Sequence, residues 1–224
     1  MIKIVCGEIG AKAIKDKEVV IIVVDLLRAS STIINGLENG AKMYIPSLTV
    51  EDAWENLKKV PDALLAGERG GIKIPKFHLG NSPIEHTSEI VNGKKIIFTS
   101  SNCTRIINIV LKNPIVLLGA LINLESIKKV VNNFQEKNKI PTYLIAVGKK
   151  DEIGIEDIVT AEIIKQTLLG KELININEIQ HKILESPHAK LLKILGFEDD
   201  LKFCTQLNTH QTVPIFSNKG FIKY

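Results

Sequence analysis

The sequence predicts an α/β fold in three layers (α/β/α), with a mostly parallel mixed sheet and a helix-rich C-terminal third. Short β-branched runs alternate with helical patterns up to about residue 150, which indicates strands joined by crossover helices. Residues 19–25 are a nearly continuous run of Val and Ile, as expected of a strand covered on both faces. After about residue 150 the strand signal fades, so the last third of the chain is expected to be mainly helical.

The individual elements follow from the same patterns. Besides residues 19–25, short apolar runs predict strands at residues 42–46, 63–67, 95–100, 115–119 and 142–147. Residues 49–60 and 123–137 carry apolar side chains on one stripe and are expected to be amphipathic helices. The remaining helices are expected at residues 156–169, 176–184, 188–195 and 199–204, with a last strand at residues 211–216.

Two short motifs predict helix ends. Ser82-Pro83-Ile84-Glu85 has the pattern of a capping box with proline at the first helical position, so a helix is expected to start there. Asn39-Gly40 predicts a helix end before the next strand. Residues 1–224 show no linker, internal repeat or low-complexity segment. We therefore interpret them as a single domain, with two subdomains that share a crevice as the alternative.

The composition is that of a globular protein, with 45% hydrophobic and 24% charged residues. The net charge is +4, but the lysines are scattered and aromatics make up only 5%, so no nucleic-acid partner is expected. No signal-peptide pattern opens the chain and its apolar runs are too short to cross a bilayer, so no membrane partner is expected. Three distant cysteines without metal-ligand spacing fit a reducing compartment, which makes the cytoplasm the expected location. A homodimer is left open.

Polar residues collect where the predicted strands end, and ligands of open α/β sheets bind at that edge. The chain has 26 lysines but only three arginines, Arg28, Arg69 and Arg105, and each lies in one of these segments. Arginine offers a planar fork to phosphate, carboxylate or sulfonate. The three therefore predict a site for a small, multiply anionic ligand. The alternative is that they form structural ion pairs with Asp25 and Glu68.

Carboxylates at the same edge predict a metal site. Asp25 and Glu68 each end a buried strand, and such oxygens suit Mg²⁺ with retained waters. This ion can bridge to a phosphate and activate water. Asp157 is the third candidate ligand, and capping of its helix is an equal alternative.

Serine and histidine residues are less informative. Ser30, Ser31 and Ser101 are candidates both for ligand binding and for helix capping, whereas the capping box accounts for Ser82. The five histidines show no metal-ligand spacing, and His78 is the best placed of them.

These segments resemble the 2-phosphosulfolactate phosphatase family, the ComB-like proteins of coenzyme M biosynthesis. The order and spacing of the matching segments agree along nearly the whole chain, which makes the set specific although each segment alone is common. The segments are residues 24–32, which include Asp25-Leu26-Leu27-Arg28, and residues 66–71, 77–83, 99–105, 156–157 and 196–214.

The resemblance implies a three-layer α/β/α fold and a Mg²⁺-dependent enzyme that hydrolyses (R)-2-phospho-3-sulfolactate to 3-sulfolactate and phosphate. On this interpretation the catalytic residues are Asp25, Arg28 and Glu68, and Mg²⁺ is held by Asp25, Glu68 and Asp157. A water molecule is the preferred nucleophile and Asp25 the alternative. The residues expected to bind the substrate are Ser30, Ser31, Arg69, Gly70, Asn81, Ser101, Asn102, Thr104 and Arg105.

The chain departs from the family pattern at three places. Asn102-Cys103-Thr104 replaces Asn-Gly-Thr, and a positive φ at that position would strain Cys103 by roughly 1–2 kcal/mol. Ala146-Val147-Gly148 replaces Cys-Ala-Gly, and Gly154 replaces a small polar residue. Two alternatives therefore stay open: a phosphatase of another small phosphorylated hydroxy acid such as 2-phospholactate, and a weakly active anion-binding homologue.

Overall fold

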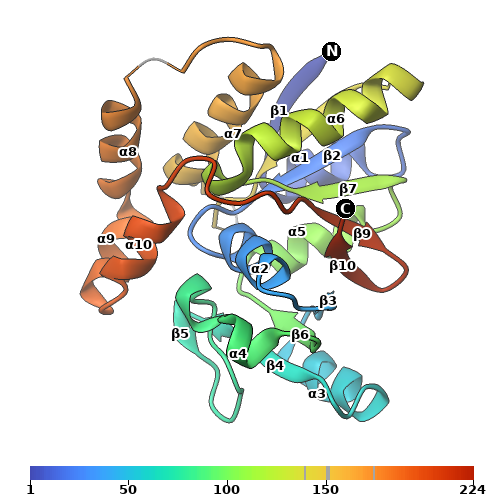
Figure 1. Cartoon of the computed structure of the whole chain (residues 1–224), viewed down its shortest axis with the longest axis vertical. Coiled ribbons are helices and arrows are strands. Elements are labelled where there is room, and N and C mark those ends of the chain that lie inside the picture. The colour runs from blue at the N-terminus through green and yellow to red at the C-terminus, as the bar shows by residue number, and fades with distance from the viewer. Residues whose placement is uncertain (139, 150–151, 174) are drawn as a thin grey trace.

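The computed structural model describes residues 1–138, 140–149, 152–173 and 175–224, and it confirms the predicted α/β class (Figure 1). The strands are β1 (Ile2–Cys6), β2 (Val20–Val24), β3 (Met43–Pro46), β4 (Leu64–Arg69), β5 (Ile72–Lys73), β6 (Lys95–Thr99), β7 (Ile115–Leu118), β8 (Thr142–Ala146), β9 (Pro214–Ser217) and β10 (Gly220–Lys223). The helices are α1 (Gly7–Ile14), α2 (Ala29–Glu38), α3 (Val50–Lys59), α4 (Ser88–Val91), α5 (Cys103–Val110), α6 (Leu124–Asn138), α7 (Ile155–Leu168), α8 (Ile176–Leu184), α9 (Pro187–Ile194) and α10 (Glu198–Cys204). Two 3₁₀ turns complete the description, η1 (Pro83–Glu85) and η2 (Leu121–Asn123).

The sheet consists of two parallel sets joined by an antiparallel hairpin. Its ten strands follow the order β1-β8-β2-β7-β9-β10-β3-β6-β4-β5. Strands β1, β8, β2 and β7 form the first parallel set, and β3, β6 and β4 form the second. The β9–β10 hairpin links them through one residue pair on each side, Leu117–Ile215 and Tyr44–Phe221. The mixed, mostly parallel sheet predicted from the sequence is thus confirmed.

The hairpin lets the two parallel sets share one crevice. Three successive antiparallel pairings reverse the strand direction between β7 and β3. Neighbouring strands are normally rotated by about 20–25°, so the six steps from β2 to β4 add roughly 120–150°. Together with the reversal, this rotation turns the carboxyl ends of both sets toward a common space. The contact of 2.5 Å between Arg28 Nη2, after β2, and the Gly71 carbonyl, after β4, shows that the two ends meet.

Strand β2 lies in the middle layer, and its side chains are fully buried. Val20, Ile22 and Val24 pack into one apolar core with α6 and α7. Ile21 and Val23 point the other way, into a second core with α1, α2 and α5. The two-sided burial expected from the continuous Val and Ile run is therefore observed. A smaller third core lies between α3 and the second parallel set.

One sequence prediction at a helix end is confirmed and the other is wrong. Helix α2 ends at Glu38, followed by Gly40 with a φ of +92°. By contrast, Ser82 does not cap a helix and precedes only the single turn η1. Its Oγ instead donates to Asp200 Oδ1 at 2.6 Å, and the Glu85 carboxylate accepts from the Gly80 N–H. The Ser82 hydroxyl binds the buried carboxylate of Asp200 and therefore does not form the capping box.

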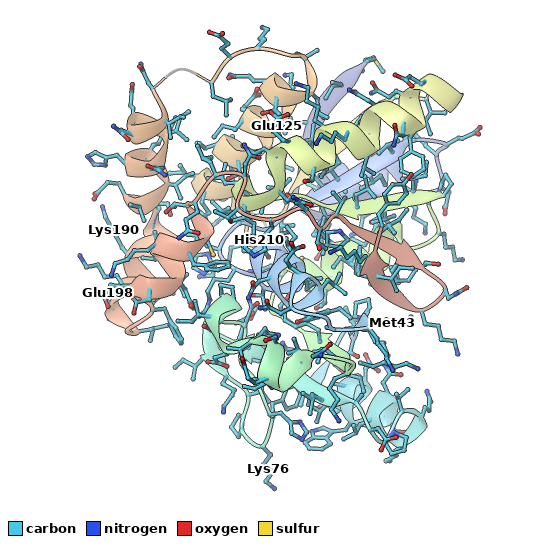
Figure 2. All side chains as sticks on the ribbon, in the orientation of Figure 1. Met43, Lys76, Glu125, Lys190, Glu198 and His210 are labelled. Atoms are coloured by element: carbon cyan, nitrogen blue, oxygen red, sulfur yellow. The ribbon has the colours of Figure 1, made fainter. Side chains whose placement is uncertain are left out.

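The C-terminal third is helical from α7 to α10, as predicted, and α8, α9 and α10 stand together beside the sheet (Figure 1). Charged side chains cover the outside, and Lys76 and Lys190 point away from the molecule (Figure 2). Among the described residues, no helix combines the length and the apolar character needed to cross a bilayer.

Candidate functional site

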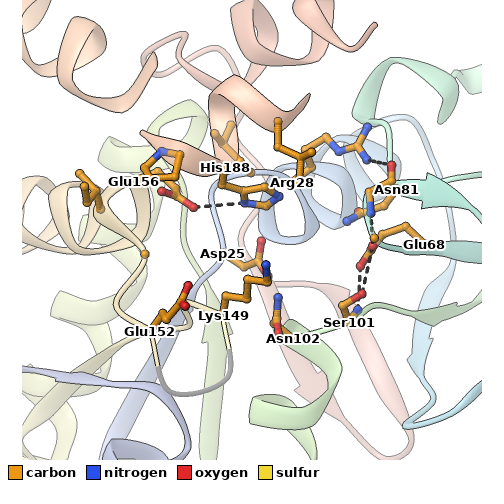
Figure 3. A pocket seen from close by; sticks show the side chains of 18 of the residues that line it. Asp25, Arg28, Glu68, Asn81, Ser101, Asn102, Lys149, Glu152, Glu156 and His188 are labelled. Atoms are coloured by element: carbon orange, nitrogen blue, oxygen red, sulfur yellow. Dashed lines mark hydrogen bonds and ion pairs between the residues drawn. The ribbon is translucent and has the colours of Figure 1, made fainter. Parts of the chain in front are cut away.

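A cavity of about 440 Å³ lies where the carboxyl ends of β2, β4, β6 and β8 meet the C-terminal helices (Figure 3). We call its first side the strand-end wall; it comprises Asp25, Arg28, Glu68, Gly70, Gly71, Asn81, Ser101 and Asn102. We call the opposite side the helical wall; it comprises Ile155, Glu156, Pro187, His188 and Leu191, from α7 and α9. The segment after β8 closes the cavity between the two walls with Gly148, Lys149, Glu152, Ile153 and Gly154.

Asp25 follows directly after β2 and is 9% exposed. Its Oδ1 accepts a hydrogen bond of 3.2 Å from the Ala29 N–H at the start of α2. Burial raises the pKa of Asp25 to about 6, and the charges of Glu68 and Glu156 act in the same direction, against His188 and the Ala29 N–H. A carboxylate with a pKa this close to neutrality can take up and release a proton at working pH.

Glu68 holds the two neighbouring strand-end loops together. Its Oε1 accepts from the Ser101 N–H at 2.7 Å, and its Oε2 accepts from the Gly71 N–H at 2.8 Å. The Ser101 hydroxyl adds a bond of 3.1 Å to Oε2. These three hydrogen bonds fix the orientation of the Glu68 carboxylate. Glu68 is therefore a structural link between β4 and β6 as well as a lining residue of the cavity.

Arg28 lines the cavity and also ties the strand-end wall to α10. Its Nη1 lies 2.6 Å from Asp200 Oδ2, and both side chains are buried, with 2% and 0% exposure. The guanidinium also lies 4.0 Å from the centre of the Phe197 ring. Asp200 in turn accepts from Ser82. Arg28 is thus held rigidly by a buried ion pair, a geometry in which loss of either partner is costly.

Of the three arginines, all of which lie in the described part of the chain, only Arg28 lines the cavity. Arg69 donates to the Glu68 carbonyl and to Thr99 Oγ1. Arg105 forms an ion pair with Glu8 of α1. The structure thus brings one of the three arginines to the cavity, while Arg69 and Arg105 bind protein groups nearby, so a ligand facing all three stays a prediction.

The predicted metal ligand Asp157 does not line the cavity. It lies at the third position of α7, with its Oδ1 bound to the Leu26 N–H at 2.9 Å and its Oδ2 to the Gly148 N–H at 2.8 Å. Burial and the neighbouring charges of Asp25 and Glu156 raise its pKa well above the ordinary value. The geometry gives Asp157 the role of a clamp that joins the loops after β2 and β8.

The hydroxyl groups proposed to bind the ligand are mostly engaged with the backbone. Ser30 Oγ accepts from the Asp25 N–H, and Ser31 Oγ donates to the Leu26 carbonyl. Thr104 Oγ1 donates to the Ser100 carbonyl. All three side chains are buried beneath the cavity and none lines it. Ser101 is the exception, since it lines the cavity.

The amides at the strand-end wall remain candidates for substrate binding. Asn81 and Asn102 both line the cavity. Asn81 is 5% exposed, and its Oδ1 has no hydrogen-bond partner among the described residues. A buried amide oxygen normally has a partner, so a donor from a ligand or water suits this position. His78 instead accepts from the Leu65 N–H and lies outside the cavity.

The pairing of His188 with Glu156 on the helical wall was not predicted, although residues 156–157 belong to the matching segments. His188 Nδ1 lies 3.2 Å from Glu156 Oε1. Burial lowers the pKa of His188, but the hydrogen bond to Glu156 and the charges of Glu156, Asp25 and Glu68 outweigh it, so the pKa is raised. Burial opposes ionisation of Glu156 as well, yet the bond with His188 leaves its pKa lowered. Near His188 the sequence shows only the helix start at Ser186-Pro187, and this pattern does not indicate a cavity.

The field of the cavity suits an anion together with a cation. Helices α2, α5, α7 and α9 all begin at its lining, so four positive helix ends point toward it. The lining also carries the carboxylates of Asp25, Glu68, Glu152 and Glu156. These outnumber the cationic side chains, which are Arg28, Lys149 and His188. A multiply anionic ligand would therefore need a further positive charge in the cavity.

Asp25 and Glu68 are the candidate ligands for Mg²⁺ in the cavity. Within the described residues, no three His, Cys, Asp or Glu side chains form a ready-made metal site. Mg²⁺ usually keeps several waters and takes one or two carboxylates plus substrate phosphate oxygens. Asp25 and Glu68, which share the strand-end wall, supply that number of hard oxygen ligands. The residues present thus fit Mg²⁺ bound jointly with a phosphate.

Two of the three departures from the family pattern, Cys103 and Gly154, are accommodated without strain. Cys103 is the first residue of α5 and is absent from the residues with positive φ, so the strain expected there does not arise. Gly148 keeps the family glycine, with a φ of +65° and the Glu152 carbonyl 2.4 Å from where a Cβ would lie. At Gly154 a Cβ would come within 3.1 Å of Asp157 Oδ2. Glycine at 154 therefore leaves room for the Asp157 clamp.

Comparison with known proteins agrees with the resemblance. Residues 6–219 match the family described as 2-phosphosulpholactate phosphatase. A Clostridium perfringens protein named "Probable 2-phosphosulfolactate phosphatase" is 33% identical over 233 residues, which cover 96% of this chain and 92% of that protein. A Thermotoga maritima protein of the same name is 34% identical over 213 residues, 90% of each chain. A third, from Clostridium tetani, is 34% identical over 230 residues, 96% of each chain.

Proposed function

The chain belongs to the 2-phosphosulpholactate phosphatase family and is a phosphoric monoester hydrolase, and we propose that it hydrolyses 2-phospho-3-sulfolactate to 3-sulfolactate and phosphate with Mg²⁺ as cofactor. The observation that carries the proposal is the convergence of Asp25, Glu68 and Arg28 in one cavity at the strand ends. The proposal includes a role in coenzyme M biosynthesis and a cytoplasmic location, for which the free state of the three cysteines is support.

The charges of the cavity match this substrate, which carries phosphate, sulfonate and carboxylate groups. Arg28, Lys149 and His188 are the cationic side chains that line it. The helix ends at α2, α5, α7 and α9 add partial positive charge. Mg²⁺ held by Asp25 and Glu68 would neutralise phosphate charge and polarise water.

Asp25 is placed to handle the proton of the attacking water. In the metal-free protein its carboxylate has a pKa of about 6, and bound Mg²⁺ would lower this pKa, so the carboxylate is ionised when water attacks and can accept the proton. Glu68 keeps the loops after β4 and β6 in place, which fixes Gly71 and Ser101 at the cavity. The ion pair with Asp200 fixes the position of the Arg28 guanidinium at the cavity. Direct attack by Asp25 remains the alternative, and incorporation of ¹⁸O from water into Asp25 would support it.

The direct test is phosphate release from racemic 2-phospho-3-sulfolactate, measured with Mg²⁺ and with EDTA. We expect release that requires Mg²⁺ and stops near half conversion, because the resemblance implies an enzyme that acts on the (R) enantiomer. An Arg105→Lys variant serves as control, since Arg105 lies outside the lining and binds Glu8. Equal release in EDTA would remove Mg²⁺ from the proposal. Tight binding of 3-sulfolactate without phosphate release would instead make the chain an anion-binding homologue.

A second substrate is favoured by the apolar part of the lining. Leu27, Ile153, Ile155 and Leu191 line the cavity beside the charged groups. A methyl group, as in 2-phospholactate, finds apolar contacts there that a sulfonate does not use. A higher kcat/KM for 2-phospholactate than for 2-phospho-3-sulfolactate would make this ester the substrate.

A further inference from the structure

We propose that His188 donates the proton to the leaving-group oxygen of the phosphate ester, and that Glu156 is the positioning residue that holds its ring. The inference rests on the proposed phosphatase activity and names a catalytic residue for it. On the strand-end wall, Glu68 is bound to backbone N–H groups, Arg28 is paired with Asp200, and Asp25 is assigned to the attacking water. A departing alkoxide nevertheless needs a proton, and a positioned acid contributes about 10²–10⁴-fold to such a step.

The position of the imidazole ring is set from two elements. His188 lies at the second position of α9, where Ser186 Oγ accepts from the Ala189 N–H at 3.1 Å and Pro187 occupies the first helical position. Glu156 lies at the second position of α7 and is 4% exposed. Its Oε1 is 3.2 Å from His188 Nδ1. The ring is therefore held on its Nδ1 side by a buried carboxylate.

The opposite side of the ring faces the cavity. His188 lines the cavity, and its ring and the Asp25 carboxylate point toward each other (Figure 3). With Nδ1 bound to Glu156, the other nitrogen, Nε2, is available to a group bound between the two walls. An ester whose phosphorus lies near Asp25 and Arg28 would then present its bridging oxygen to this nitrogen.

The charges around His188 favour its protonated form. Glu156 is its hydrogen-bond partner, and Asp25 and Glu68 act on it across the cavity. Glu152 also lines the cavity, while Lys149 and Arg28 are the opposing positive charges. Arg28 is neutralised by Asp200. In the metal-free protein this balance is negative, which agrees with the raised pKa of His188.

The proton transfers balance in this arrangement. The water oxygen forms a bond to phosphorus while Asp25 takes one water proton. The bond between phosphorus and the ester oxygen breaks, and its electron pair stays on that oxygen. The Nε2 proton of His188 moves to the oxygen and completes the hydroxyl of 3-sulfolactate. Asp25 then releases its proton to solvent and His188 takes one up, so one water is consumed. If Asp25 attacks directly, the same donation from His188 serves the first bond cleavage.

The test measures kcat and KM against pH for the wild-type protein, His188→Asn and Glu156→Gln, with His181→Asn as control. His181 lies on α8, is exposed and is absent from the cavity lining. We expect the wild-type kcat to fall on the alkaline side, as His188 loses its proton. His188→Asn should lower kcat by about 10²–10⁴-fold with little change in KM, and should remove the alkaline fall. Glu156→Gln should keep the alkaline fall but move it to lower pH.

The outcomes separate this inference from the proposed function. If the wild-type protein releases no phosphate, the proposed function fails. If it is active and His188→Asn raises KM without lowering kcat, or keeps the alkaline fall, His188 only binds the substrate and the inference is overturned. Binding of 3-sulfolactate to each variant by calorimetry shows that the cavity is intact. Imidazole titration by NMR gives a readout free of turnover, and an unchanged His188 pKa in Glu156→Gln would refute the role of Glu156.

Discussion

The two walls of the cavity use their polar residues differently. On the strand-end wall, Glu68 accepts from the Gly71 and Ser101 backbone and holds loops together. On the helical wall, His188 and Glu156 bind each other and present the ring to the cavity. The loops after strands must satisfy their own backbone groups, because buried N–H and C=O groups need partners. Polar residues at strand ends are therefore needed to stabilise the loops, and only some of them are available to bind a ligand.

A buried ion pair connects the strand-end wall to the C-terminal helices. Arg28 of the strand-end wall binds Asp200 of α10, and their contact spans 172 positions in the sequence. Helix α10 packs against α9, the helix that carries His188. The position of the helical wall thus depends on a charge that belongs to the strand-end wall. Four substitutions separate these roles.

The largest effect is expected for turnover in Asp25→Asn. The amide cannot accept the proton of the attacking water, so kcat should fall by about 10²–10⁴-fold. Phosphate release at saturating substrate and Mg²⁺ measures it. The control is Asp62→Asn, an exposed position away from the cavity, which should keep wild-type activity. Retained activity in Asp25→Asn would show that the strand-end wall does not carry the chemistry.

The next effect concerns the link between the walls. Asp200→Ala leaves the buried Arg28 without its partner, and the free energy of unfolding should fall by about 3–5 kcal/mol. Asp199→Ala is the matched control, because Asp199 is 73% exposed and pairs with Lys202 at the surface. It should change the stability by less than about 1 kcal/mol. Urea unfolding measures both, and equal effects would mean that Arg28 finds another partner.

A third effect is the pH dependence of stability in the metal-free protein. The pKa of Asp25 is raised from 3.8 to about 6, so the folded state binds this proton more tightly than the unfolded state. The stabilisation present below pH 3.8 is therefore lost as the pH rises through 6. At about 1.4 kcal/mol per unit, Asp25→Asn should be more stable than wild type at pH 8 by roughly 3 kcal/mol. The difference should vanish near pH 4, as urea unfolding in EDTA would show. A difference that is constant with pH would contradict the raised pKa.

The smallest effect compares two serines. Ser31 Oγ donates to the Leu26 carbonyl under the cavity, so Ser31→Ala should reduce stability by about 1 kcal/mol and leave KM unchanged. Ser101 lines the cavity, so Ser101→Ala should raise KM. Steady-state kinetics with thermal unfolding distinguishes the two. An increase in KM for Ser31→Ala would show that Ser31 contributes to substrate binding.

Sequence patterns predicted the continuous apolar strands and several amphipathic helices, and they missed short elements without such a pattern. The run at residues 115–119 became β7 (Ile115–Leu118), because a strand covered on both faces is apolar throughout. Strand β1 was missed, since it is only half-buried at the edge of the sheet and has no such run. Strand β10 was missed as well, because it is defined by its pairing with β9 and β3, and the local sequence does not show this pairing.

The same division applies to the cavity. Asp25, Glu68 and Asn102 could be placed at the cavity from the sequence, because the edge of the sheet at which a strand ends is a local property. His188 could not, nor could its pairing with Glu156, because the two lie 32 positions apart on two helices whose packing brings them together. Arg69, Arg105 and Asp157 were expected at the ligand but bind protein groups instead.

The sequence by itself determined the layered α/β fold, the strand ends that form the cavity and, through its motifs, the family. Only the tertiary structure decided which polar side chains face the ligand. The physical reason is that each polar side chain can bind either a nearby backbone group or the cavity contents. The local sequence contains both options, and the packing of α7, α9 and α10 against the strand ends selects between them.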